Sequence, residues 1–111
     1  MLNEKTKEQE FQEHINLVSF VHAQKVLNEA LEKLYEVEIR LLNENVYVER
    51  EKLKLKAVYF NEERNHVAIS STDNLTVEFD FNTCEEGTSS KMHEKLYFRN
   101  DNMTLSITIK K

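Results

Sequence analysis

Several residue types on which common folds and sites depend are scarce in this chain. Its 111 residues include no proline, no tryptophan, one glycine and one cysteine. Loops that bind nucleotides or dinucleotides need several glycines so that the backbone can approach phosphate, and Gly87 alone excludes them. Cys84 alone allows neither an internal disulfide nor a zinc site built on cysteine pairs.

Long apolar runs and an excess of positive charge are also missing. No segment approaches the ~20 apolar residues of a membrane-spanning helix, and the opening residues, MLNEK, lack the apolar core of a signal peptide. A small chain without disulfides is typical of a reducing compartment, so we expect a cytoplasmic protein with no membrane partner. The formal net charge of −5 argues against nucleic acid as the main partner.

The N-terminal third of the chain has a helical pattern. Residues 4–34 contain good helix formers and no helix breaker, but at ~100° per residue their apolar side chains form two nearly opposite stripes that change phase near His22. One straight helix over this span would measure about 45 Å, whereas a compact domain of this size is roughly 35 Å across. We therefore expect one kinked helix or two helices, with a strand over residues 14–21 as the alternative.

From residue 35 onward, apolar residues alternate with polar ones, which predicts β-strands. Turn-like segments divide this region into roughly six strands. The sequence thus predicts a single α+β domain, residues 1–111, in which a helical segment (1–34) packs on an antiparallel meander (35–111). The sheet either stays open under the helix or curls into a small barrel.

The last two strands form the clearest hairpin of the predicted sheet. Asp101 and Asn102 both tolerate positive φ and suit a two-residue turn. That turn pairs Phe98 with Leu105, so the apolar faces of the two strands match. The polar residues of the final strand should then face water; they are Thr104, Ser106 and Thr108.

Other parts of the predicted sheet are less regular. Matching apolar faces pairs Tyr59 with Val67, while a break in the alternation predicts a β-bulge near Arg50. Residues 82–92 carry the only glycine and the only cysteine, and we expect them to form the longest loop.

Apolar residues on a face that should be wet are the most informative feature of the sequence. Val58 and Phe60 lie out of phase with Tyr59, so either both faces of the sheet are covered there or a patch is exposed for a partner. Together with one stripe of the helical segment they make the predicted protein interface: Phe11, Ile15, Val18, Val21, Val58 and Phe60.

A basic row on one strand offers an alternative site. Lys52, Lys54 and Lys56 alternate with apolar residues, and small barrels use such rows with interleaved aromatics to hold single-stranded nucleic acid. Here the aromatics are missing, and Glu36 and Glu38 of the neighbouring strand oppose the lysines. The row is therefore interpreted first as a solvated face.

No group of residues points to catalysis. The four histidines lack the spacing of a metal site, Cys84 and His93 have no third residue to orient them, and the adjacent carboxylates Glu85 and Glu86 fall in the predicted loop. We therefore assign no catalytic, cofactor-binding or metal-binding residue and expect no cofactor.

The favoured function is a non-enzymatic protein-interaction module. Its size and acidity suit a small bacterial or phage (mobile-element) regulator or inhibitor that binds another protein, and the opposed apolar stripes suggest a homodimer formed through the N-terminal segment. Two alternatives remain: a ligand-binding barrel or small enzyme with a cavity between helix and sheet, and single-strand nucleic-acid binding along the lysine row.

Overall fold

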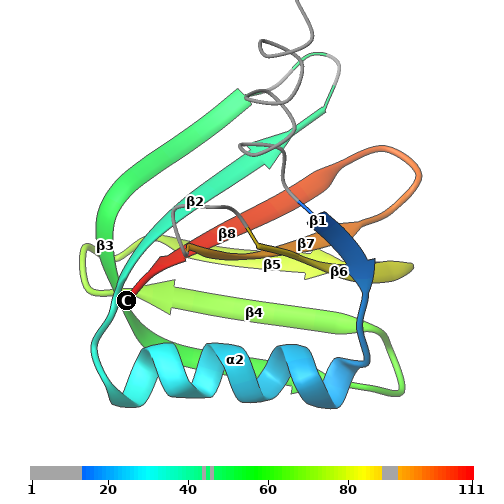
Figure 1. The fold of residues 1–111 in the computed structure, drawn as a ribbon. Helices are drawn as coiled ribbons and strands as arrows, with labels where there is room; N and C mark the ends of the chain where they lie inside the picture. Colours follow the sequence, from blue (N-terminus) through cyan, green and yellow to red (C-terminus); the bar gives the residue numbers. More distant parts are fainter. Residues whose placement is uncertain (1–13, 44, 46, 89–92) are drawn as a thin grey trace, which may run out of the picture.

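The computed structural model describes residues 14–43, 45, 47–88 and 93–111. Its elements, in chain order, are β1 (His14–Leu17), α2 (Phe20–Glu32), β2 (Glu36–Leu42), β3 (Tyr47–Asn61), β4 (His66–Ser71), β5 (Thr76–Asp80), β6 (Thr83–Thr88), β7 (Glu94–Arg99) and β8 (Thr104–Lys110). The strands form one antiparallel sheet with the helix packed on it (Figure 1). This confirms the α+β class.

The sheet has eight strands instead of six and does not close into a barrel. Its strand order is β1-β6-β7-β8-β2-β3-β4-β5, so β1 and β5 are the two edges. It is also not a simple meander, because β2 pairs with β3 on one side and with the final strand β8 on the other. Alternating polarity shows which side chains face inward, but it does not specify a strand's neighbours.

The N-terminal segment begins with a strand in the part of the chain that is described. β1 pairs with β6, with Asn16 opposite Glu86, and the helix begins only at Phe20. Ser19 caps this helix, because its hydroxyl accepts a hydrogen bond of 3.1 Å from the N–H of His22. The predicted continuous or paired helices are therefore wrong over residues 14–19, and the strand alternative is right for β1.

The two apolar stripes of this segment lie mainly on two different elements, although Val21, from the same stripe as Ile15, lies in the first turn of the helix. The helix buries one stripe, formed by Ala23, Val26, Leu27 and Ala30. Ile15, from the other stripe, lies on β1, where a period of two replaces the helical period. The change from strand to helix, between Leu17 and Phe20, lies just before the phase change near His22.

In the predicted loop at residues 82–92, the structure has a strand from Thr83 to Thr88, and residues 89–92 lie outside the described residues. β6 pairs with β7 along its whole length, with Cys84 opposite Phe98 and Gly87 opposite Lys95. The single glycine and two adjacent glutamates suggested a loop, but pairing with strands distant in sequence overrides such local preferences.

The predicted C-terminal hairpin is confirmed residue by residue. Phe98 lies opposite Leu105 and Leu96 opposite Ile107, and the N–H of Asn100 donates to the carbonyl of Met103 at 3.0 Å across the two-residue turn. The prediction that the polar residues of β8 face water is wrong for Ser106 and Thr108, however, while Thr104 is half-buried. Ser106 and Thr108 are buried because longer side chains of the neighbouring strands flank these short ones in the middle of the sheet.

Two irregularities in β3 decide which of its residues face inward. Between Val37 and Ile39 of β2 the register shifts, which places a bulge at Glu51 and Lys52 and confirms the one expected near Arg50. Lys52 has a φ of 58°, in the left-handed region.

The second shift lies between Leu55 and Ala57 of β3. It moves the pairing by one residue from the prediction, so that Phe60, and not Tyr59, lies opposite Val67. A one-residue slip exchanges the two faces of a strand. Val58 and Phe60 therefore point inward, which explains the apolar residues on the seemingly wet face.

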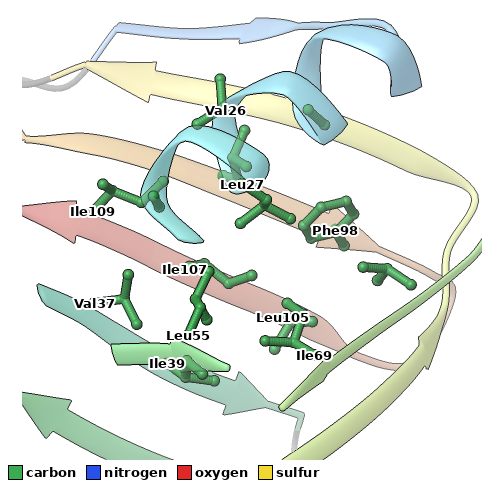
Figure 2. Packing of buried hydrophobic residues seen from close by; sticks show 14 of the residues in the cluster. Val26, Leu27, Val37, Ile39, Leu55, Ile69, Phe98, Leu105, Ile107 and Ile109 are labelled. Carbon is green, nitrogen blue, oxygen red and sulfur yellow. The ribbon is translucent and has the colours of Figure 1, made fainter. Parts of the chain in front are cut away.

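The core lies between the helix and the inner face of the folded sheet. Val26 and Leu27 of α2 lie over the strands that carry Phe98, Ile107 and Ile109 (Figure 2). The ring of Phe98 is fully buried and contacts the rings of Phe81 and Phe60, with centroids 5.1 Å and 6.0 Å away. Phe98 therefore joins β7 to β3 and to the segment after β5.

We predict that Phe98→Ala lowers the free energy of unfolding by about 3–5 kcal/mol, because a large side chain leaves a cavity in a packed core. Urea unfolding followed by circular dichroism measures the change. The control is Val21→Ala, which truncates an exposed side chain of the helix and should stay within about 0.5 kcal/mol of the parent chain. Equal effects of the two substitutions would contradict the buried position of Phe98.

Candidate functional site: an apolar groove beside edge strand β5

The outer edge of β5 carries backbone groups that no other strand uses in the described part of the chain. The N–H of Ser71 donates to the carbonyl of Leu75, and the N–H of Phe81 donates to the carbonyl of Asn65, each at 2.9 Å. Hydrogen-bonding direction alternates along an antiparallel strand. The N–H and C=O groups of Thr76 and Glu78 therefore point away from β4, toward the free edge.

An apolar groove of about 250 Å³ borders this edge. Ile39 and Leu41 of β2 and Val48 of β3 form one side of it. The segment from Leu75 to Glu78 forms the other side, with the half-buried side chain of Val77 facing the groove. The groove exists because the bend in β3 folds β4 and β5 back over the inner face of the β2–β3 hairpin.

An ion-pair network stiffens the outer face of the same hairpin. The guanidinium of Arg40 lies 2.6 Å from the carboxylate of Glu38 and 3.2 Å from that of Glu49. The hydroxyl of Tyr47 donates to Glu49 at 2.5 Å, and this bond lowers the pKa of Glu49 below its ordinary value and raises that of Tyr47.

Three carboxylates meet in this network, which raises the question of a metal site. Oxygens of Glu38, Glu49 and Glu51 lie within 4.8 Å of one another. Arg40 already neutralises two of these groups, and Lys110 lies 3.9 Å from Glu38. The cluster is therefore explained as an internal salt-bridge network across β8, β2 and β3.

The structure separates the five described residues of the predicted interface. Val58 and Phe60 are half-buried and pack against the core. Val18 also packs against the core, whereas Ile15 and Val21 are exposed. Phe11, the sixth, lies outside the described residues.

The predicted lysine row lies on the outer surface of β3. Lys52, Lys54 and Lys56 are all exposed, and Glu36 lies opposite Lys54 as expected. Bulges at Lys52 and beside Lys56 interrupt the even spacing that a row along a nucleic-acid backbone would have. Binding of a nucleic acid there stays a prediction.

Of the cysteine and histidines that the sequence offered as candidate site residues, Cys84 is buried, and His22 and His66 pair with carboxylates. Cys84 is 2% exposed on the inner face of β6, and its burial, together with Glu85 and Glu86, raises the pKa of the thiol from 9.0 to about 12. His22 pairs with Glu86 at 2.9 Å, which links the helix to β6, and His66 pairs with Asp80 at 2.6 Å. The two histidine–carboxylate pairs thus link neighbouring elements, α2 to β6 and β4 to β5.

Comparison of the chain with protein-family models, with curated proteins and with solved structures found no match. Among the described residues, no helix combines the length and the apolar character that crossing a membrane requires. Over the residues that the structure describes, the fold is of the α+β class, with one helix on an open eight-stranded antiparallel sheet.

Sequence reasoning missed the groove. Its residues follow ordinary strand alternation, and Leu41 and Val48 were indistinguishable from any pair flanking a hairpin turn. The available signal was that Leu75 and Val77 continue an apolar face up to the turn before β5. That face lies over β2 only because β3 bends. The sequence predicted the bulge near Arg50 but not the second bulge, between Leu55 and Ala57.

We predict that Cys84 resists alkylation by iodoacetamide in the folded protein even slightly above pH 9, the ordinary thiol pKa, because its pKa is raised to about 12. Since the folded-state pKa is the higher one, the stabilisation from the neutral buried thiol is complete below about pH 9. It is lost as the pH rises toward 12. Mass spectrometry measures the rate, and the urea-unfolded chain is the reactive control. Equal rates would contradict the buried position.

Proposed function

We propose that this chain is a non-enzymatic protein-interaction module that adds an extended segment of a partner protein as a further strand on β5. One observation carries the proposal. The outward N–H and C=O groups of Thr76 and Glu78 border a groove whose walls are apolar. The two features that strand addition requires, a free strand edge and an apolar groove beside it, are therefore adjacent.

The two features have different roles in this kind of recognition. Backbone hydrogen bonds along the edge supply affinity for any extended chain, and pockets for alternate side chains supply specificity. The groove of about 250 Å³ suits about two branched aliphatic side chains at alternate positions of the added strand. Ile39, Leu41 and Val48 lie where those side chains would enter.

Charge favours a basic partner. Glu78 is exposed at the rim of the groove, and the whole chain carries a net charge of −5. A segment that alternates apolar residues with lysine or arginine matches both the groove and its rim. We propose that the chain acts in this way as a small cytoplasmic regulator or inhibitor of bacterial or phage origin. The free thiol of Cys84 is compatible with a reducing compartment.

Random linear peptides displayed on phage, selected on the purified protein, test the proposal. We expect enrichment of segments with apolar residues at alternate positions and basic residues between them. A synthetic peptide of the enriched sequence should shift the NMR signals of the Thr76 and Glu78 amides. Val48→Glu, which introduces a charge into the groove, should weaken its binding by at least about 10-fold in calorimetry.

Tyr59→Glu is the matched control. It also places a glutamate in β3, but on the outer face beyond the second bulge, so peptide affinity should not change. Circular dichroism checks that both variants keep the parent fold. The proposal is rejected if no sequence is enriched, or if Val48→Glu and Tyr59→Glu bind the selected peptide equally well.

A further inference from the structure

β1 forms the opposite edge of the sheet (Figure 1), and it too has backbone groups that no described strand uses. The N–H of Val18 donates to the carbonyl of Cys84 at 3.0 Å, and Asn16 lies opposite Glu86. By the alternation of an antiparallel pair, the backbone groups of Ile15 and Leu17 point away from β6. Within the described residues, β6 is the only strand that pairs with β1.

This edge lacks the features that protect natural edge strands. Proteins commonly place charged residues or proline on an exposed edge to prevent pairing with another chain. On β5, Glu78 and Asp80 would repel an acidic chain such as a second copy, whereas β1 has the sequence HINL. Its outer face instead presents two apolar side chains, Ile15 at 44% and Leu17 at 74% exposure.

We infer that β1 pairs antiparallel with β1 of a second copy of this chain, across a two-fold axis at Asn16. This register places Ile15 opposite Leu17 of the second copy, and Leu17 opposite its Ile15. Both pairs then use the backbone groups that already point outward, and all four apolar side chains gather on one face of a continuous sheet.

Charge explains why a second copy fits this edge. Two chains of net charge −5 repel each other over most of their surfaces, and β1 carries no aspartate, glutamate, lysine or arginine. The carboxylates nearest to it on β6 are already paired, Glu85 with Arg99 at 2.6 Å and Glu86 with His22 at 2.9 Å. In a two-fold symmetric contact, both copies contribute the same surface, so an uncharged β1 faces an uncharged β1.

The interface differs from the helix-mediated dimer that the sequence suggested. The part of the segment that carries Ile15 is a strand, so backbone pairing replaces helix packing. Four-residue strands make a contact at the small end of specific interfaces, and we expect the dimer to dissociate on dilution.

Light scattering coupled to size-exclusion chromatography, over a dilution series, is the first test. The expected result is twice the chain mass of 13.2 kDa at high concentration. The double variant Ile15→Lys with Leu17→Lys should weaken association by about 100-fold or more, because four lysines would meet at the axis. Tyr59→Lys, an exposed site on β3, is the control and should remain dimeric.

Disulfide trapping tests the register itself. Residues at position 16 of the two copies form a pair without mutual hydrogen bonds, whose Cα atoms lie about 4.5 Å apart, a separation that a disulfide spans. Asn16→Cys should therefore form covalent dimers under mild oxidation, while Asn28→Cys, exposed on the helix, should form few.

A wild-type chain that is monomeric up to its solubility limit overturns the inference. So does a dimer that survives the double lysine substitution, or equal cross-linking of the two cysteine variants. These results do not bear on the peptide groove, which borders the other edge of the sheet, so the two proposals fail independently.

Discussion

The change of partner halfway along β3 is the constraint on which the rest of this structure depends. The first half of the strand pairs with β2 and the second half with β4. The strand has bulges where the pairing changes, one of them at Lys52 with a φ of 58°, and it bends there while it pairs with both partners. The bend folds the sheet over its own inner face, and the helix fills the remaining side of the core.

The packing of aromatic rings follows from that bend. Phe60 comes from the second half of β3 and Phe98 from β7, and their ring centroids are 6.0 Å apart. Phe20, at the start of the helix, contacts Phe81 at 4.8 Å. Phe81 in turn contacts Phe98 at 5.1 Å, so these rings pack against one another in the core. The groove beside β5 is an apolar hollow that the bend leaves open to solvent.

The two edges of the open sheet have opposite character, and this suggests a division of roles. β5 is acidic and lies beside a groove, which suits an extended basic segment of another protein. β1 is uncharged and carries exposed aliphatic side chains, which suits its own copy. A sheet that paired at both edges would present two β5 grooves in one symmetric assembly, and linked sites can bind a partner with repeated segments more tightly than either site alone.

The sequence by itself determined the features that local chemistry controls. Asp101 and Asn102 determined the last hairpin and the pairing of Phe98 with Leu105, and the alternation of polarity located six strands and the bulge near Arg50. Only the tertiary structure decided that residues 14–17 and 83–88 are strands, because their pairing joins segments distant in the chain. It also decided the face of Val58 and Phe60, since a one-residue bulge reverses every side chain after it. The groove likewise depends on the tertiary structure, because its two walls, formed by residues 39, 41 and 48 and by residues 75–78, are far apart in the sequence.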